Sequence, residues 1–87
     1  MARTIVKVLG MGDRVTGKNR TTGNPYDFRK VAFGFVNQYG STDVSVNIVD
    51  GTTLDDLHVQ VGNLYNAVVN QVKNVYYIDL LDLIESP

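Results

Sequence analysis

The chain has 87 residues, 44% of them hydrophobic and 20% charged, with a formal net charge of −1. This length allows one small core, so residues 1–87 are expected to form a single domain. Because the chain has no cysteine, disulfides and thiolate metal sites are excluded. No apolar run approaches the roughly 18 residues that a membrane helix needs. We therefore expect a cytoplasmic protein that binds no metal or cofactor and does not enter a membrane.

The small net charge conceals an uneven distribution of charge. Residues 1–30 carry seven cations and two anions, a balance of +5, whereas residues 31–87 carry one cation and seven anions, a balance of −6. Such asymmetry points to a polyanionic partner. A basic segment that only balances the acidic remainder within a dimer would give the same pattern.

The first predicted element is a strand at residues 4–9, TIVKVL, in which β-branched residues are frequent. Gly10 and Gly12 are expected to end or bend it, as glycines do where the strands of small barrels coil. Arg3 and Lys7 interrupt the apolar run, and no small-residue cleavage site follows it. The segment therefore predicts a strand and not a signal peptide.

A basic loop follows at residues 14–30, RVTGKNRTTGNPYDFRK. Its beginning approaches the phosphate-loop pattern GxxxxGK[ST], but Asn19 stands where the pattern needs a hydroxyl. Gly23 and Pro25 also oppose the helix that should begin there. We therefore reject a phosphate-loop enzyme. The cations of the loop are Arg14, Lys18, Arg20, Arg29 and Lys30.

The next predicted strand, residues 26–36, has two different faces. One face carries the candidate core residues Val31, Phe33 and Phe35. The other carries Tyr26, Phe28 and Lys30, followed by Ala32 and Gly34, whose small side chains are expected to leave a shallow groove.

Two rings on one strand face beside five cations suit a single-stranded nucleic acid. Bases can stack on Tyr26 and Phe28 while the cations hold the phosphates. Aromatic side chains more often belong to a core, and packing of both rings under the loop is the alternative. We favour nucleic-acid binding because of the neighbouring cations.

A third strand is predicted at residues 44–49, VSVNIV, because its side chains alternate strictly. We expect one set to point inward and the other outward: Val44, Val46 and Ile48 inward, and Ser45, Asn47 and Val49 outward. A helix is predicted to start after Gly51, since Thr52 or Thr53 can cap it and acidic residues follow in the first turn.

Residues 54–72 allow two interpretations. Apolar residues recur at helical spacing, which indicates one amphipathic helix, but Gly62-Asn63 interrupts the pattern. The alternative is a short helix to about His58 and then two strands, LYNAVV and VYYIDLLDLI, joined near residues 71–74. We favour the second interpretation. Both predict an all-β domain with one helical element between the third and fourth strands, the plan of an OB-type barrel.

The sequence contains no recognisable catalytic constellation. His58 is the only histidine, and no cysteine or serine motif accompanies it. Asp79 and Asp82 are expected on opposite faces of a strand, so they cannot act on one substrate. We therefore expect a protein that is not an enzyme.

Several short motifs resemble those of the single-stranded-DNA-binding, helix-destabilising proteins of filamentous phages. The likeness begins at residues 23–26, GNPY, after the basic loop, and continues through residues 44–51, VSVNIVDG. Leu64-Tyr65 and Ile78-Asp79 follow in the same order, so the resemblance covers most of the chain. Asn47 stands where the family tends to have a lysine, and Leu80 and Asp82 stand where arginines would be expected.

The resemblance implies a small five-stranded OB-like barrel that forms a two-fold dimer. It also implies cooperative coating of single-stranded DNA, with little sequence preference, during phage or mobile-element replication in the host cytoplasm. The roles it transfers are phosphate binding to Arg14 and Arg20, base stacking to Tyr26 and an apolar base contact to Phe28. Together with the basic loop, the predicted nucleic-acid-binding residues are Arg14, Lys18, Arg20, Tyr26, Phe28, Arg29 and Lys30.

Two further expectations concern partners. A domain this small, with apolar residues on both faces of its last strand, is expected to be a homodimer through that strand. DNA is favoured over RNA as the ligand. The alternative function is a small β-barrel protein-interaction module whose basic hairpin binds an acidic partner.

Overall fold

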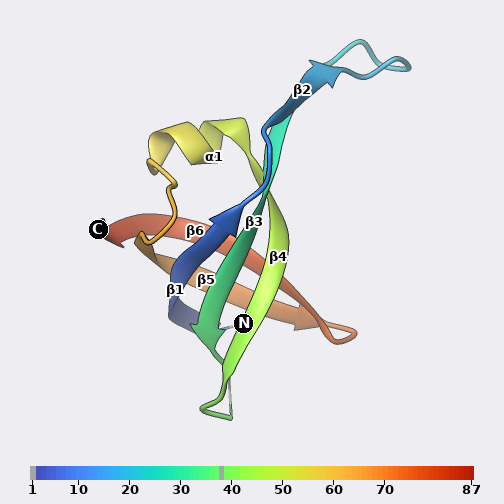
Figure 1. Ribbon diagram of the computed structural model, residues 1–87. Coiled ribbons are helices and arrows are strands. Elements are labelled where there is room, and N and C mark those ends of the chain that lie inside the picture. Colours follow the sequence, from blue (N-terminus) through green and yellow to red (C-terminus); the bar gives the residue numbers. More distant parts are fainter. Residues whose placement is uncertain (1, 38) are drawn as a thin grey trace.

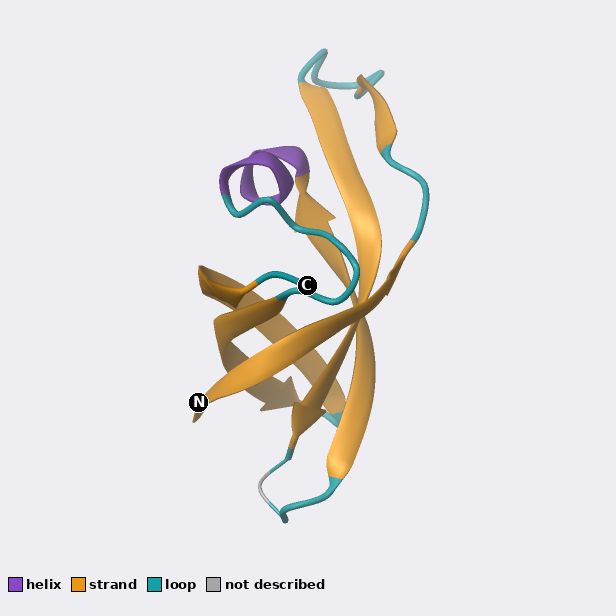
Figure 2. Cartoon of the chain, turned by 60° about the vertical axis from the view of Figure 1, so that its left-hand side comes forward, coloured by secondary structure: helices purple, strands orange, loops and turns teal. Residues whose placement is uncertain are grey.

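The computed structural model describes residues 2–37 and 39–87, which form six antiparallel strands and one short helix (Figures 1 and 2). The elements are β1 (Ala2–Met11), β2 (Val15–Lys18), β3 (Pro25–Val36), β4 (Thr42–Asp50), α1 (Gly51–Asp56), β5 (Leu64–Val72) and β6 (Val75–Glu85). This confirms the predicted all-β class and the short-helix interpretation of residues 54–72. The helix follows the fourth strand and not the third, because the basic loop itself contains β2. The described part of the chain has no helix with the length and apolarity to cross a membrane.

The sheet is organised around β3. One edge of β3 pairs with β1 and, farther along, with β2, while the opposite edge pairs with β4. β1 also pairs with β5, and β5 with β6, so β4 and β6 lie at the two ends of the sheet. Between β1 and β2 the ladder continues through the Gly12 N–H, which donates to the Lys30 carbonyl at 2.8 Å. β1 and β2 therefore follow the same side of β3.

The sheet is open between β4 and β6, and this is where it differs from the expected barrel. Among the described residues these two strands share no hydrogen-bond ladder. Side chains bridge them instead: the Tyr76 hydroxyl donates to Asp43 Oδ2 at 2.8 Å, and Ser45 Oγ donates to the Tyr76 carbonyl at 3.4 Å. The Phe35 and Tyr76 rings meet edge to face, with centroids 5.0 Å apart. β4 and β6 thus approach each other without completing a barrel.

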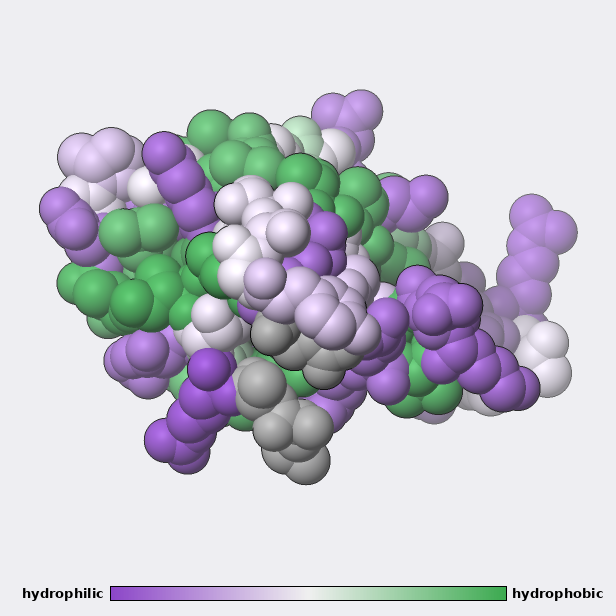
Figure 3. Space-filling model, turned by 90° about the horizontal axis from the view of Figure 1, so that it is seen from below, coloured by the Kyte–Doolittle hydropathy of each residue, from purple (hydrophilic) through white to green (hydrophobic). Residues whose placement is uncertain are grey.

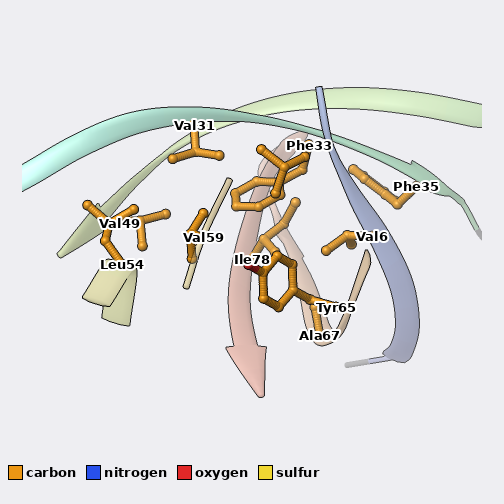
Figure 4. Packing of buried hydrophobic residues seen from close by; sticks show 11 residues of the cluster. Val6, Val31, Phe33, Phe35, Val49, Leu54, Val59, Tyr65, Ala67 and Ile78 are labelled. Atoms are coloured by element: carbon orange, nitrogen blue, oxygen red, sulfur yellow. The ribbon is translucent and has the colours of Figure 1, made fainter. Parts of the chain in front are cut away.

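The core lies inside the curved sheet and is covered at one end by α1 and the loop after it (Figure 4). Val31, Phe33 and Phe35 are buried, as their alternation predicted. The other buried apolar residues come from β1, β4, α1, β5, β6 and the loop after α1: Val6, Val8, Val49, Leu54, Val59, Tyr65, Ala67 and Ile78. β2 contributes nothing to this core, because all four of its residues are exposed.

The predicted orientation of β4 is wrong. Val44, Val46 and Ile48 are 62%, 63% and 64% exposed, whereas Val49 is buried and Ser45 and Asn47 are half-buried. Strict alternation shows that the two faces of a strand differ, but it does not show which face is inside, because a shift of one residue in the pairing register exchanges the two faces. The polar residues of β4 face the gap between β4 and β6, where they find hydrogen-bond partners. Asn47 Nδ2 donates to Ser45 Oγ at 3.0 Å, and Ser45 donates to the Tyr76 carbonyl of β6. An apolar stripe is consequently left on the outside.

The hydroxyl of Tyr65 provides a test of the packing. Tyr65 is fully buried, donates to the Leu57 carbonyl at 3.0 Å and accepts from Asn63 Nδ2 at 2.8 Å. Tyr65→Phe removes the hydroxyl to which the Leu57 carbonyl and the Asn63 amide are hydrogen-bonded. We therefore expect the free energy of unfolding to fall by about 1–3 kcal/mol in denaturant titrations. Tyr77→Phe, on a ring that is 53% exposed, is the control and should change it by less than about 0.5 kcal/mol. Equal effects would contradict this account of the core.

Candidate nucleic-acid interface

The basic loop forms a two-stranded hairpin, residues 15–28, which we call the wing. It projects from the rest of the sheet at the end where α1 lies (Figure 1). β2 and the start of β3 pair from Val15 with Phe28 to Lys18 with Pro25. Because the residues of β2 are exposed, the shape of the wing depends on this ladder and on its turn.

The turn of the wing is held by Asn19. Its side-chain Oδ1 accepts from the backbone N–H groups of Thr21 and Thr22 at 2.8 and 3.2 Å. Its backbone N–H donates to the Asn24 carbonyl, and Gly23 adopts a φ of 73°, which favours glycine. Arg20 therefore extends from a hydrogen-bonded turn.

Tyr26 and Phe28 lie side by side on the wing, as predicted. Their ring centroids are 6.0 Å apart with an interplanar angle of 36°, and Tyr26 is 43% exposed. The Tyr26 ring lies over Gly17, where a Cβ would overlap its hydroxyl. A hollow of about 480 Å³ borders both rings and is lined by residues 25–28 and 50–52. Neither ring belongs to the core cluster, so the alternative that both are core residues is wrong.

The predicted cations occupy different environments. Lys18, Arg20 and Lys30 are exposed and form no ion pair with any residue in the described ranges. Arg29 is half-buried, and its Nε donates to the Gly12 carbonyl at 2.7 Å. Lys18 and Arg20 belong to the wing, and Lys30 follows it on β3.

Arg14, which the sequence predicts to bind phosphate, is hydrogen-bonded to two carboxylates. Its Nε and Nη2 donate to the two oxygens of Asp27 at 2.7 and 2.6 Å, and Nη1 donates to Asp55 at 3.1 Å. These hydrogen bonds raise the pKa of Arg14 and hold the pKa of Asp27 below its ordinary value. A Cβ on buried Gly51 would overlap the Asp27 carboxylate. Arg14 therefore connects the base of the wing to α1.

The groove expected at Ala32 and Gly34 is partly filled. Leu9 lies at a bulge in β1, and its side chain covers Gly34, where a Cβ would lie 3.1 Å from Leu9 Cδ1. The aromatic platform therefore consists of the two rings and does not continue as an open groove along β3.

Sequence reasoning missed Asp27, Gly51 and Asp55 as residues that position the site. The alternation of β3 does show that Asp27 points away from the rings, which is a usable signal. Its partner could not be found locally, since Arg14 is 13 residues from Asp27 and 41 from Asp55.

Among the described residues, His, Asp and Glu side chains form no group of three that could hold a metal. The chain matches no known family model, no curated protein and no solved structure. The arrangement of the wing is therefore the basis for any assignment of function.

The Arg14–Asp27 pair predicts a titration that can be measured. The pKa of Asp27 is lower in the folded state than its ordinary value of 3.8. The pair therefore stabilises the fold fully at pH values above this ordinary pKa, and its contribution is lost as the pH falls through the folded-state pKa. Carboxyl ¹³C NMR should show Asp27 titrating below 3.8 in the wild type and returning toward it in Arg14→Ala. Lys18→Ala, on the same wing, is the control and should leave the Asp27 curve in place. An Asp27 titration that is insensitive to Arg14 would contradict the assigned contact.

Proposed function

We propose that this protein is a non-enzymatic single-stranded-DNA-binding protein that coats the strand with little sequence preference during phage or mobile-element replication. The observation that carries the proposal is a pair of adjacent rings, an exposed Tyr26 and a half-buried Phe28, on a hairpin whose cations Lys18 and Arg20 form no ion pair with the described residues. Stacking on rings and neutralisation of phosphates are the two contacts that single-strand binding needs.

The ring pair favours unpaired bases over a duplex. Bases in a duplex are already stacked on one another, so their faces are not available to Tyr26 and Phe28. Stacking also tolerates every base, because each has a flat π-face, which agrees with low sequence preference. The preference for DNA over RNA comes from the resemblance to the filamentous-phage proteins, which covers most of the chain.

The cations of the wing supply the phosphate contacts in this proposal. Lys18 and Arg20 are on the same hairpin as the rings, and Lys30 follows Phe28 on the same face of β3. Arg14 has a different part: it holds the base of the wing through Asp27 and Asp55. We therefore move phosphate binding from Arg14 to Lys18, Arg20 and Lys30.

The stacking role is tested by Tyr26→Ala. We expect binding of a single-stranded oligonucleotide, followed by quenching of tyrosine fluorescence or by anisotropy, to weaken by about 1–3 kcal/mol, with an unchanged circular dichroism spectrum. Tyr39→Ala is the matched control, because Tyr39 is 82% exposed in the turn between β3 and β4, away from the wing. An equal loss in both variants, or none in either, would reject stacking on Tyr26.

The electrostatic role is tested by the salt dependence of binding. For Arg20→Ala, the slope of log affinity against log salt should become shallower by about 0.7, the value for one lost contact with a single strand. Lys73→Ala removes a cation from the β5–β6 turn and should leave the slope unchanged. Binding of an acidic protein in preference to oligonucleotides would instead support the protein-interaction alternative.

A further inference from the structure

We infer that the hollow beside Tyr26 and Phe28 takes a nucleobase, and that the Asp50 carboxylate there favours bases with an exocyclic amino group. These bases are cytosine, adenine and guanine, whereas thymine and uracil present carbonyl oxygens instead. The inference rests on the proposed function, because it names which bases the same site prefers. It assigns base recognition to Asp50, which lies outside the predicted nucleic-acid-binding residues.

Strand pairing places Asp50 at the edge of the ring pair. Asp50 is the partner of Phe28 in the ladder between β3 and β4. Directly paired residues have their side chains on the same face of the sheet, with Cβ atoms about 4.5–5.5 Å apart. On the opposite edge of β3, Phe28 pairs with Val15 of β2. The Phe28 ring therefore has an apolar side chain on one side and a carboxylate on the other, and a base stacked on it has an edge within reach of Asp50.

The hollow has room for a base. Its volume is about 480 Å³, within the range of roughly 300–1,000 Å³ that is typical of small-ligand sites, and residues 25–28 and 50–52 line it. The wing extends to the right of the molecule in Figure 1, and in Figure 3 the portion on that side is mostly hydrophilic. The rings are therefore an apolar platform in hydrophilic surroundings, which suits a flat base with polar edges.

Asp50 has an oxygen available for a ligand. Its Oδ1 accepts from the Thr53 backbone N–H at 2.7 Å and so caps α1, while its Oδ2 accepts no hydrogen bond from the residues that the structure describes. Asp50 is exposed and forms no ion pair within the same ranges. Asp27 also lines the hollow, but both of its carboxylate oxygens accept from Arg14. Asp50 is therefore the carboxylate that can accept from the amino group of a base.

A carboxylate distinguishes bases by whether they present a donor or an acceptor. Cytosine presents its 4-amino group, a donor from which aspartate and glutamate accept. Uracil and thymine present a 4-carbonyl oxygen, which cannot donate to a carboxylate and is repelled by it. The carboxylate also repels phosphate, so the base edges face Asp50 while the sugar-phosphate backbone lies toward the cations. One exposed hydrogen bond changes affinity by about three- to tenfold, which is compatible with a low sequence preference.

Oligomers of deoxycytidine and deoxyuridine test the inference, because their bases differ only at N3 and at position 4. Binding is measured by fluorescence anisotropy at one salt concentration and slightly alkaline pH, where cytosine is unprotonated. We expect the wild type to bind the deoxycytidine oligomer about three- to tenfold more tightly than the deoxyuridine oligomer of the same length. The ratio of the two Kd values is the readout, since a change in net charge affects both oligomers alike.

Two variants of Asp50 change this ratio in different ways. Asparagine caps a helix as well as aspartate does, so Asp50→Asn keeps the bond from Thr53. Its amide nitrogen replaces Oδ2 and can donate to the 4-carbonyl of uracil, so the preference should reverse. Asp50→Ser also keeps a cap but has a single side-chain oxygen, so it should abolish the preference. Asp56→Asn is the matched control, because Asp56 is an exposed carboxylate of α1 outside the hollow, and the wild-type ratio should remain.

Three results would overturn the inference. The first is equal affinity of the wild type for the two oligomers. The second is a preference for deoxycytidine that survives in both Asp50 variants when their circular dichroism spectra are unchanged. The third is the same change of ratio in Asp56→Asn, which would make net charge and not a hydrogen bond the cause. Failure of the proposed function would be distinguishable, because the wild type would then bind neither oligomer.

Discussion

The ion pair of Arg14 with Asp27 and Asp55 fixes the wing to the rest of the molecule. β2 has no buried side chain, so the orientation of the wing depends on its ladder with β3, which continues into the core, and on the Arg14 contacts. Arg14 joins the base of the wing to α1, and Gly51 leaves room for the carboxylate that it binds. Because Asp27 alternates with Tyr26 and Phe28, this contact holds one face of the strand while the rings occupy the other.

The strand β3 therefore belongs to two parts of the molecule, the wing and the core. Its first part, with Tyr26 and Phe28, extends past the core and belongs to the wing. Its second part has a core face, with Val31, Phe33 and Phe35, and an outer face next to the exposed valines of β4.

Local patterns in the sequence predicted much of this arrangement. The core face of β3, the adjacent rings and the short helix followed by a strand depend on spacing and on the Gly62-Asn63 break, all of which are local. The orientation of β4 could not be predicted locally: Ser45 points inward, where it reaches the carbonyl of Tyr76, 31 residues away. The carboxylate partners of Arg14 were missed for the same reason, since they come from β3 and α1. Charge patterns show where cations are, but not which are neutralised.

Amide chemical-shift mapping tests most directly whether the wing binds a single strand through its rings. A short single-stranded oligodeoxynucleotide would be added to ¹⁵N-labelled protein at physiological salt. The account predicts that the largest shifts lie at residues 15–30, that the Tyr26 ring protons move upfield on stacking, and that Lys73 and Asn74 stay in place. Shifts centred on β5 and β6, or no shifts with a strand that the protein demonstrably binds, would contradict it.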